Sequence, residues 1–328
     1  MKAVYVSEFG GPENLGIREV PDPPEPAALQ VVVRVKAAGL NRADLLQRRG
    51  FYPPPAGYSP NIPGLEFAGE VVQSGPDVQS FQPGDRVFGI TAGEAQAEFL
   101  VTDEKQLARI PDSLTFAEAG AVPEAFTTAY DAIFTQAKLE ARESILVHAA
   151  GSGVGLAAVQ LAKAKGALVI GTSRTAEKLE KCKEFGLDHA VVVHDANNFA
   201  EEVVSITEGM GVNVILDLVG GAYFSENLRS LALKGRLMLV GLTAGSKAEF
   251  DLGLALSKRL TITGTVLRAR PSNEKAEVTR EFESNVVPLF VDGTLKANID
   301  RVFPYEEVRE AHEYLESNES FGKVVLEF

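Results

Sequence analysis

The sequence predicts an α/β protein in which a doubly wound, six-stranded parallel sheet is inserted into a β-rich, barrel-like domain. Short strand-like runs separated by Gly and Pro fill the first third of the chain, as in a compact β domain. From about residue 123 strands and helices alternate, which indicates a parallel sheet with right-handed crossovers. The final strand-like run, 322–328, has no place in the completed sheet, so we expect it to return to the β domain. The expected domains are 1–122 with 292–328, and 123–291.

The β domain is predicted from short apolar runs and the turns between them. Its strands are expected at 4–6, 15–20, 30–35, 66–72, 85–88 and 97–101. One short helix is expected over 41–49, ended by Gly50. The three prolines of Phe51-Tyr-Pro-Pro-Pro-Ala-Gly57 fix φ and remove backbone donors. This segment is therefore expected to be an exposed, fairly stiff loop, and it carries Tyr52.

The second domain is predicted from six apolar strands with helices between them. Its strands are expected at 145–147, 168–172, 190–193, 212–218, 236–240 and 260–264. Its helices are expected at 124–133, 153–165, 176–185, 198–208, 223–231, 252–258 and 278–290. A short strand at 302–303 and a helix at 306–315 then lead to the terminal strand.

The first strand of this sheet leads into a glycine-rich turn, Ala149-Ala-Gly-Ser-Gly-Val-Gly155. In a strand–turn–helix crossover of this kind, backbone N–H groups and the positive end of the helix approach a pyrophosphate. The pattern departs from G-x-G-x-x-G, because Ala150 and Ser152 stand where the first two glycines would fall. A plain strand–turn–helix is the alternative, but the surrounding alternation of strands and helices favours a dinucleotide site.

The end of the second strand indicates which nucleotide binds. A carboxylate about 20 residues after the turn would accept hydrogen bonds from the ribose 2′-OH of NAD. Thr172-Ser-Arg-Thr175 contains neither Asp nor Glu. Arg174 can pair with a 2′-phosphate, Ser173 can donate to it, and Lys178 lies one helical turn further on. The sequence therefore favours NADPH over NADH; the alternative is that Arg174 and Lys178 are only solvated residues at a helix start.

Composition argues against several classes of function. The chain has 328 residues, 45% hydrophobic and 23% charged, which is typical of a soluble globular protein. Its net charge of −13 argues against a nucleic acid or an anionic membrane as partner. No apolar run approaches the roughly 20 residues of a membrane span, and the N-terminus shows no signal-peptide core. Cys182 is the only cysteine, so no internal disulfide is expected and we expect a cytoplasmic protein.

The few thiol and imidazole groups argue against a metal centre. A zinc ion often stabilises the alkoxide that forms when a ketone is reduced. Cys182 and the scattered histidines form no ligand cluster, and we expect the histidines to be structural or surface residues: His148, His189, His194 and His312. Without a metal the substrate should be electrophilic, a quinone or an α,β-unsaturated carbonyl, for which a hydrogen-bond donor suffices. Tyr52 is the candidate donor; an aromatic ring packed on prolines is the alternative.

Several segments together resemble a known family. They are 10–14, 40–45, 63–69 and 83–87 in the first domain, and 148–155 and 322–326 further on. Over essentially its whole length the chain resembles the zinc-independent quinone oxidoreductase branch of the medium-chain dehydrogenase/reductase superfamily. Zinc-dependent relatives place a Cys where this chain has Asn41, and Gly-His-Glu where it has Gly64-Leu-Glu66. Within the branch, 41–55 and 122–125 are similar to the subgroup whose vertebrate member is induced by a tumour suppressor.

The resemblance implies NADPH-dependent quinone reduction in a cleft between a groES-like domain and a Rossmann domain, in a homodimer. It implies a catalytic or substrate-positioning role for Tyr52 and Ser152, and nicotinamide-side contacts for Asn41 and Thr128. The other cofactor contacts that it implies are Ser152, Gly153, Val154, Ser173, Lys178, Leu242, Val266, Leu267, Arg268 and Lys323. Arg174 lies where relatives vary, so its assignment rests on its charge.

Three functions remain open from the sequence. The first is a metal-independent NADPH:quinone oxidoreductase. The second is an NADPH-dependent 2-alkenal or enoyl reductase, which needs a proton donor for the α-carbon, and the sequence shows no unambiguous one. The third is a low-activity NADPH-binding sensor protein, against which Tyr52 and Ser152 argue. The expected partner is a small quinone or conjugated carbonyl, with no nucleic acid and no membrane, and the chain is expected to form a dimer or a tetramer.

Overall fold

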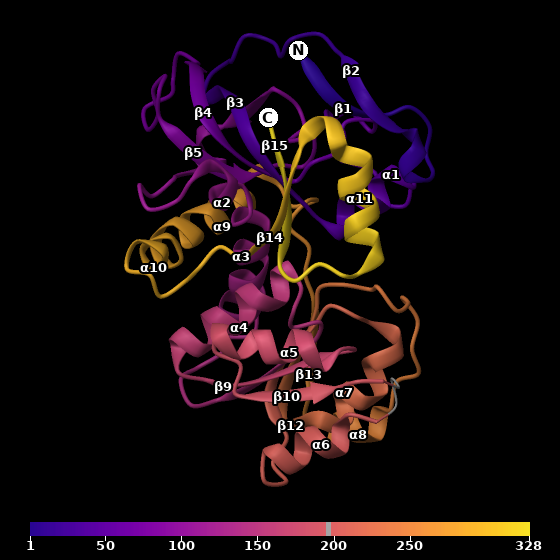
Figure 1. Cartoon of the computed structure of the whole chain (residues 1–328). Helices are drawn as coiled ribbons and strands as arrows, with labels where there is room; N and C mark the ends of the chain where they lie inside the picture. The colour runs from indigo at the N-terminus through magenta and orange to yellow at the C-terminus, as the bar shows by residue number, and fades with distance from the viewer. Residues whose placement is uncertain (195–197) are drawn as a thin grey trace. The chain divides into compact units, whose positions relative to one another are not determined.

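The computed structural model describes residues 1–194 and 198–328 (Figure 1). They form two compact units: Met1–Thr127 with Leu267–Phe328, and Thr128–Val266. The second unit is therefore inserted between two segments of the first. The sequence places 267–291 in the inserted domain, whereas the structure places these residues in the first unit. The reason is the packing of the helix that they form.

That helix, α9 (Ser272–Asn285), contacts β7 (Leu107–Arg109) of the first unit. The ring of Phe282 packs edge-on against the ring of Phe88, with the ring centroids 5.5 Å apart. The single helix predicted over 278–290 is instead two helices, α9 and α10 (Val287–Val291). Pro288 lacks the N–H that would continue the hydrogen bonding of α9, so the chain starts a new helix there.

A seven-stranded sheet forms the core of the first unit, in the order β14-β15-β3-β4-β5-β7, with β6 also pairing with β3. Its strands are β3 (Gln30–Leu40), β4 (Glu66–Ser74), β5 (Arg86–Ile90), β6 (Phe99–Asp103), β7, β14 (Ile299–Pro304) and β15 (Lys323–Glu327). Val31, Val33 and Val35 alternate along β3 and share one core cluster with the fully buried Phe67. The antiparallel pair β1 (Lys2–Val6) and β2 (Leu15–Glu19) lies outside this sheet. These strands confirm the predicted β domain.

The last strand of the chain closes the first unit. β15 runs antiparallel to β3, with Val324 opposite Leu40, and parallel to β14. Figure 1 shows β14 and β15, drawn in yellow, side by side. The predicted return of the C-terminal strand to the first domain is confirmed. Its register places Lys323 at the end of β3.

Short helices complete the first unit: α1 (Arg42–Arg48), α2 (Phe116–Gly120), α9, α10 and α11 (Val308–Ser317). α1 and α11 are in contact, and the fully buried side chain of Arg48, the last residue of α1, lies at this contact. Its guanidinium donates to the carbonyl oxygen of Gly10 (3.1 Å) and to Glu316 (2.7 Å). The predicted helix 124–133 is α3 (Pro123–Tyr130), continued by a π-helical segment, Asp131–Gln136.

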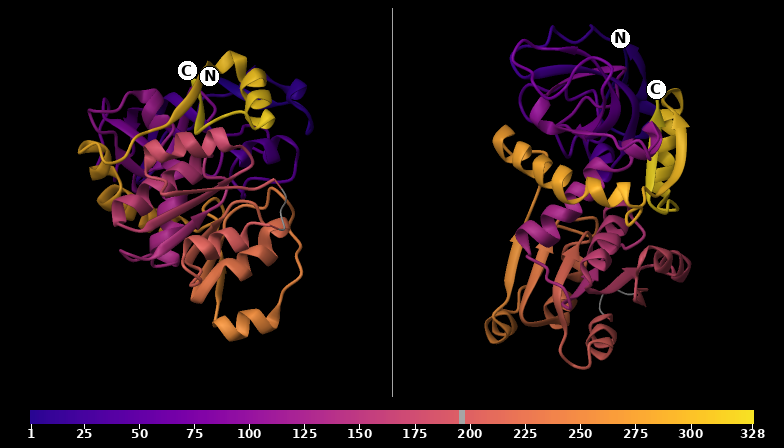
Figure 2. Two further views of the ribbon diagram at one scale, coloured as in Figure 1. Left: turned by 60° about the horizontal axis from the view of Figure 1, so that its bottom comes forward. Right: turned by 90° about the vertical axis from the view of Figure 1, so that its left-hand side faces the viewer.

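The second unit is a six-stranded parallel sheet with helices on both sides (Figure 2). Its strands are β8 (Ser144–Val147), β9 (Leu168–Ser173), β10 (His189–Val192), β11 (Val212–Asp217), β12 (Leu231–Leu239) and β13 (Thr261–Gly264). Their order, β10-β9-β8-β11-β12-β13, is that of dinucleotide-binding sheets, and it confirms the predicted doubly wound fold. The connecting helices are α4 (Gly153–Lys165), α5 (Ala176–Cys182), α6 (Ala200–Ile206), α7 (Phe224–Ser230) and α8 (Leu252–Lys258). Right-handed crossovers put α4 and α5 on one face and α6 to α8 on the other.

Candidate active site

The glycine-rich turn ends at the N-terminus of α4. Ser152 is the N-cap residue: its Oγ accepts a hydrogen bond from the N–H of Gly155 at 3.1 Å. Position 155 has no room for a side chain, because a Cβ there would lie 2.4 Å from the carbonyl oxygen of Ala149. The N–H groups of Gly153 and Val154 have no acceptor among residues 1–194 and 198–328. Two free donors at the positive end of a helix can hold an anion.

The sequence-predicted cofactor residues of the second unit follow the ends of parallel strands. Ser152 to Val154 follow β8, and the segment Ser173 to Lys178 begins at the last residue of β9. Leu242 follows β12, and Val266 follows β13. Because parallel strands end at one edge of a sheet, these segments share that edge. Thr128 is the exception: it is buried in α3.

Arg174 is exposed and has no hydrogen-bond or ion-pair partner within the part of the chain that the structure describes. Its neighbour Ser173 is half-buried, and its Oγ accepts from the N–H of Thr175 at 3.3 Å. Burial raises the pKa of the Tyr223 phenol, and the charge of Arg174 opposes that rise. The end of β9 therefore carries an available guanidinium with an aromatic side chain in electrostatic range.

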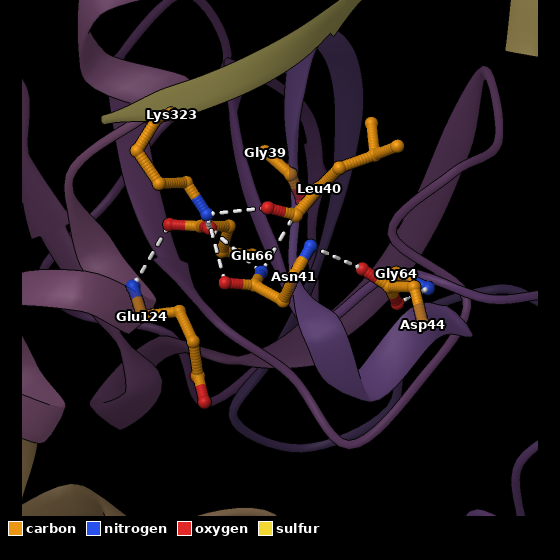
Figure 3. A network of polar contacts seen from close by, with 8 residues as sticks. All are labelled: Gly39, Leu40, Asn41, Asp44, Gly64, Glu66, Glu124 and Lys323. Atoms are coloured by element: carbon orange, nitrogen blue, oxygen red, sulfur yellow. Dashed lines mark hydrogen bonds and ion pairs between the residues drawn. The ribbon is translucent and has the colours of Figure 1, made fainter. Parts of the chain in front are cut away.

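The first unit holds a buried network of polar and charged side chains (Figure 3). The Nζ of Lys323 donates to three oxygens: the carbonyl of Leu40 (2.7 Å), Oδ1 of Asn41 (2.8 Å) and Oε1 of Glu66 (2.5 Å). Glu66 is fully buried and Lys323 is 6% exposed as a side chain. Three acceptors match the three donors of an ammonium group, so every N–H of Lys323 is used within the protein.

The Glu66 carboxylate joins three elements of the first unit. Its Oε1 also accepts from the Nδ2 of Asn41 at 2.8 Å, next to α1. Its Oε2 accepts from the backbone N–H of Glu124 at 2.9 Å, in the first turn of α3. The negative charge of Glu66 is therefore balanced by the Lys323 ammonium and by the positive end of a helix.

Asp44 is a second buried carboxyl group beside this network. It accepts from the backbone N–H of Asn41 (2.8 Å) and from that of Gly64 (3.0 Å). Burial raises the pKa of Asp44 to about 6, although both hydrogen bonds oppose the rise. Gly64 has a φ of +112°, and a Cβ there would lie 2.5 Å from the backbone nitrogen of Gln96. Only glycine brings its N–H to Asp44 in this conformation.

Glu124 carries a third carboxyl group. Its backbone N–H belongs to the network, but its carboxyl group does not. Its side chain leaves α3 on the side away from Lys323, as Figure 3 shows. Its carboxyl group has no hydrogen-bond partner among the described residues. Burial, and next the negative charge of Glu66, raise the pKa of Glu124 to about 8, while Lys323 opposes the rise. At neutral pH the group therefore carries its proton.

Tyr52 is half-buried on the proline loop, and Arg268 holds that loop. The Arg268 guanidinium donates to the carbonyl oxygens of Tyr52 (2.8 Å) and Ala92 (2.7 Å) and to Oε1 of Gln47 (2.5 Å). It also lies 4.8 Å from the centroid of the Tyr52 ring. Burial, and next the charge of Glu124, raise the pKa of the Tyr52 phenol. Tyr52 therefore stays a neutral O–H donor at physiological pH.

The residues that the sequence assigns to the site divide between the two units. The first unit holds Asn41, Tyr52, Leu267, Arg268 and Lys323, and the second holds Thr128, Ser152, Gly153, Val154, Ser173, Arg174, Lys178, Leu242 and Val266. Within the first unit the structure joins Asn41 to Lys323 and Tyr52 to Arg268. Leu267 is instead buried in a core cluster with Ile90 and Val278. Lys323 directs all its donors, and Arg268 three of its donors, to protein oxygens, so their cofactor contacts stay predictions.

Three carboxyl groups of this region were not among the residues assigned from the sequence: Asp44, Glu66 and Glu124. Each lies in a segment that carries the family resemblance, and that was the available signal. Hydrophobic periodicity does not find them, because a buried carboxyl group interrupts the apolar pattern in the same way as an exposed one. The charge of Lys323 acts on all three carboxyl groups, and Lys323 is distant from them in sequence.

The histidines and the cysteine occupy structural or surface positions. His148 is buried, with Nε2 2.6 Å from Oδ1 of Asn227 and Nδ1 2.8 Å from Oγ1 of Thr172. His312 is also buried, whereas His189 and His194 are exposed. Burial raises the pKa of the Cys182 thiol to about 12. Among residues 1–194 and 198–328 no group of three or more His, Cys, Asp or Glu residues is arranged to hold a metal ion.

The order of the parallel sheet, the glycine-rich turn after its first strand and a separate β-rich unit together are typical of a two-domain dehydrogenase or reductase. Comparison with known families agrees. A family described as "Alcohol dehydrogenase GroES-like domain" matches residues 27–135, and one described as "Zinc-binding dehydrogenase" matches residues 153–284. No helix in the described parts of the chain has the length and apolarity needed to cross a bilayer.

Individual relatives identify the branch. The human quinone oxidoreductase is 31% identical, over 99% of this chain and 97% of its own length. The bovine quinone oxidoreductase-like protein 2 is 34% identical, over 99% of this chain and 92% of its own length. The Escherichia coli quinone oxidoreductase, solved in complex with NADPH, matches all of both chains at 30% identity and a TM-score of 0.89. The CurK enoyl reductase matches 99% of this chain and 98% of its own at 28% identity and a TM-score of 0.87. The chain belongs to the quinone oxidoreductase branch of the medium-chain dehydrogenase/reductase superfamily.

Proposed function

We propose that this protein is an NADPH-dependent quinone oxidoreductase that uses no metal ion. The observation that carries the proposal is the edge of the second-unit sheet, where free backbone donors and an available guanidinium follow the ends of β8 and β9. The NADPH complex of the Escherichia coli relative supports the choice of cofactor. When bound, NADPH supplies the hydride that reduces the quinone.

The residues at this edge fit the charged groups of NADPH. The N–H groups of Gly153 and Val154, at the start of α4, would hold the pyrophosphate. Arg174 would pair with the 2′-phosphate, with Ser173 and Lys178 beside it. A carboxylate in this segment would repel that phosphate, and 172–175 has none. The site therefore selects NADPH by charge.

Two hydroxyl groups would assist the reduction. The Ser152 hydroxyl oxygen accepts from the N–H of Gly155 through one of its lone pairs, which leaves the hydroxyl hydrogen free to donate. The phenol of Tyr52 has no acceptor within the described residues and stays protonated. Each can donate to a substrate oxygen that gains negative charge, which stabilises the transition state more than the ground state.

The residues that replace zinc ligands do not fit a zinc ion. Asn41 stands where zinc-dependent relatives place a Cys, and Leu65 where they place a His. The oxygens of Asn41 and of the neighbouring Glu66 bind the Lys323 ammonium at 2.8 Å and 2.5 Å. A divalent cation at the same oxygens would face that fixed positive charge. No step of the proposed reaction passes through a metal.

Stopped-flow oxidation of NADPH with an ortho-quinone tests the proposal. We expect turnover with NADPH, much slower turnover with NADH, and no loss of activity after treatment with a chelator. Absence of turnover at high enzyme concentration would contradict quinone reduction. Cofactor binding without turnover of any substrate would favour a sensor protein instead.

The second candidate is a 2-alkenal or enoyl reductase, and Glu124 is the observation that favours it. Such an enzyme needs a proton donor for the α-carbon, and Glu124 is a carboxyl group that keeps its proton at neutral pH. The likeness to the CurK enoyl reductase points in the same direction. The ratio of kcat/KM for an ortho-quinone to that for a conjugated enal separates the two functions.

We also propose a cytoplasmic homodimer. β13 is an edge strand of the second-unit sheet, and α8, which precedes it in the chain and contacts β12, exposes Leu252 (71%) and Leu256 (79%). An unpaired strand edge and exposed apolar side chains are each suited to contact with a second copy. Light scattering with size-exclusion chromatography distinguishes monomer, dimer and tetramer.

A further inference from the structure

We propose that Glu124 is the catalytic acid of this protein, giving its proton to the substrate as the substrate gains negative charge. The proposal deepens the proposed function and rests on it. It supplies the proton source that quinone reduction and alkenal reduction both require.

The first support is the way Glu124 is held. Its backbone N–H donates to the buried Oε2 of Glu66 at 2.9 Å, which fixes the start of the side chain. The carboxyl group extends from α3 away from the Glu66–Lys323 ion pair (Figure 3). It is half-buried and has no hydrogen-bond partner within the described part of the chain. An unpartnered carboxyl group on a fixed backbone is free to meet a substrate atom.

The second support is its relation to the other candidate donor. The charge of Glu124 is the second-largest cause of the raised pKa of Tyr52, so the two groups lie within electrostatic range of each other. α3 also places Glu124 and Thr128 four residues apart, on one face of the helix. Thr128 is the residue that the family resemblance assigns to the nicotinamide side. Glu124 therefore lies within electrostatic range of Tyr52 and one helical turn from Thr128.

The third support is the set of charges around it. Glu66 from β4 and Asp44 from α1 disfavour a second negative charge, and burial adds to their effect. Lys323 from β15 and Arg268 from the segment after β13 favour that charge. Lys275 of α9 interacts with Glu124 as well. Burial and the two neighbouring carboxylates outweigh the two cations, so the pKa of Glu124 is raised to about 8.

The proton balance is simple for a quinone. Addition of a hydride converts the quinone into a hydroquinone anion. The O–H bond of the Glu124 carboxyl group breaks, and a new O–H bond forms on the hydroquinone oxygen. The carboxylate left beside Glu66 then takes a proton from water, so one quinone, one NADPH and one solvent proton give one hydroquinone and one NADP⁺. A group with a pKa near the working pH can both give and regain a proton.

Glu124→Gln is the decisive variant. Glutamine has the shape and neutral charge of protonated Glu124, so the fold is retained, but it gives no proton. Glu274→Gln is the matched control, because Glu274 is an exposed glutamate in the first turn of another helix. We expect the single-turnover rate with an ortho-quinone to fall about 100-fold in the Glu124 variant, as for loss of a general acid. The Kd for NADPH should be unchanged in the Glu124 variant. The Glu274 variant should keep both the wild-type rate and the wild-type Kd.

Infrared titration of the cofactor-free protein gives an independent measurement. Wild-type protein and the Glu274 variant should show a carboxyl C=O band that disappears as the pH rises through about 8. Glu124→Gln should lack that band. A band that persists in the Glu124 variant, or a variant rate equal to wild type, would overturn the assignment of Glu124 alone. A wild-type protein with the band but no turnover of any quinone or enal would overturn the proposed function.

Discussion

At the residue scale, the buried Lys323–Glu66 ion pair decides the chemistry of the first unit. Removing two charges from water costs several kcal/mol each, and the pair offsets this only because its other donors and acceptors are satisfied. Leu40, Asn41 and the N–H of Glu124 provide those partners. The ammonium also fixes Glu66 as the negative neighbour that raises the pKa of Glu124. One lysine therefore connects stability with the state of the proposed acid.

Lys323→Met should lower the free energy of unfolding by about 3–5 kcal/mol, because it leaves the Glu66 charge buried without its partner. Adding Glu66→Gln should restore much of that loss. Urea denaturation of the wild type, both single variants and the double variant measures the coupling. Additive effects of the two substitutions would show that the pair is not coupled.

The raised pKa of Glu124 also predicts how stability depends on pH. The folded protein keeps the proton up to a pH of about 8, whereas the unfolded chain releases it near 4.5, the ordinary pKa of a glutamate side chain. The folded state therefore binds more protons in this window, so stability falls as the pH rises from about 5 to 8, by at most about 1.4 kcal/mol per pH unit for one group. Asp44 also has a raised pKa, of about 6, so its own contribution to the pH dependence of stability is largely complete above pH 6. Urea midpoints between pH 6 and 9 should fall less steeply in Glu124→Gln, and an equal slope would contradict the raised pKa.

At the element scale, the turns after β8 and β9 have separate tasks. The turn after β8 presents backbone donors, and Ser152 completes it by capping α4. The segment after β9 presents the Arg174 side chain. The departure of Ser152 from the glycine pattern has a structural cause, because a hydroxyl caps a helix better than glycine does. Capping and substrate contact are compatible, since they use different parts of the hydroxyl group.

Arg174→Ala combined with Lys178→Ala tests the second of these segments. Loss of two cations from the 2′-phosphate position should weaken NADPH binding by about ten-fold or more and leave NADH binding nearly unchanged. The ratio of the two dissociation constants, measured by fluorescence titration, is the relevant quantity. An unchanged ratio would remove both residues from the cofactor site.

Elements were predictable from the sequence where one local pattern decides them. The parallel strands of the second unit carry short apolar runs, and the glycine turn marks the start of α4, so the doubly wound sheet followed from the alternation of strands and helices. The prediction of a single helix over 278–290 was wrong, because the apolar pattern continues through Pro288, where the backbone hydrogen bonding of the helix stops. The Lys323–Glu66–Glu124 arrangement was not predictable, because the register of β15 against β3 brings together residues that no local pattern connects.

At the scale of the whole molecule, the chain closes its first unit with its last strand. β15 lies between β14 and β3 and supplies Lys323. The second unit, Thr128–Val266, has a sheet and a core of its own. The first unit therefore depends on contacts between the two ends of the chain, whereas the second unit is built from one continuous segment. Long-range contacts form late in folding, because the entropy of loop closure opposes them.

Truncation after Asn318 should therefore affect the two units differently. It removes β15, which exposes an edge of β3, takes away the neighbour of β14 and leaves Glu66 without Lys323. We expect amide hydrogen exchange to rise across the strands of the first unit while β8 to β12 stay protected and NADP⁺ still binds. Val324→Ala, which weakens β15 without removing it, is the milder control and should cost about 1–3 kcal/mol. Equal loss of protection in both units would show that the second unit depends on the closure of the first.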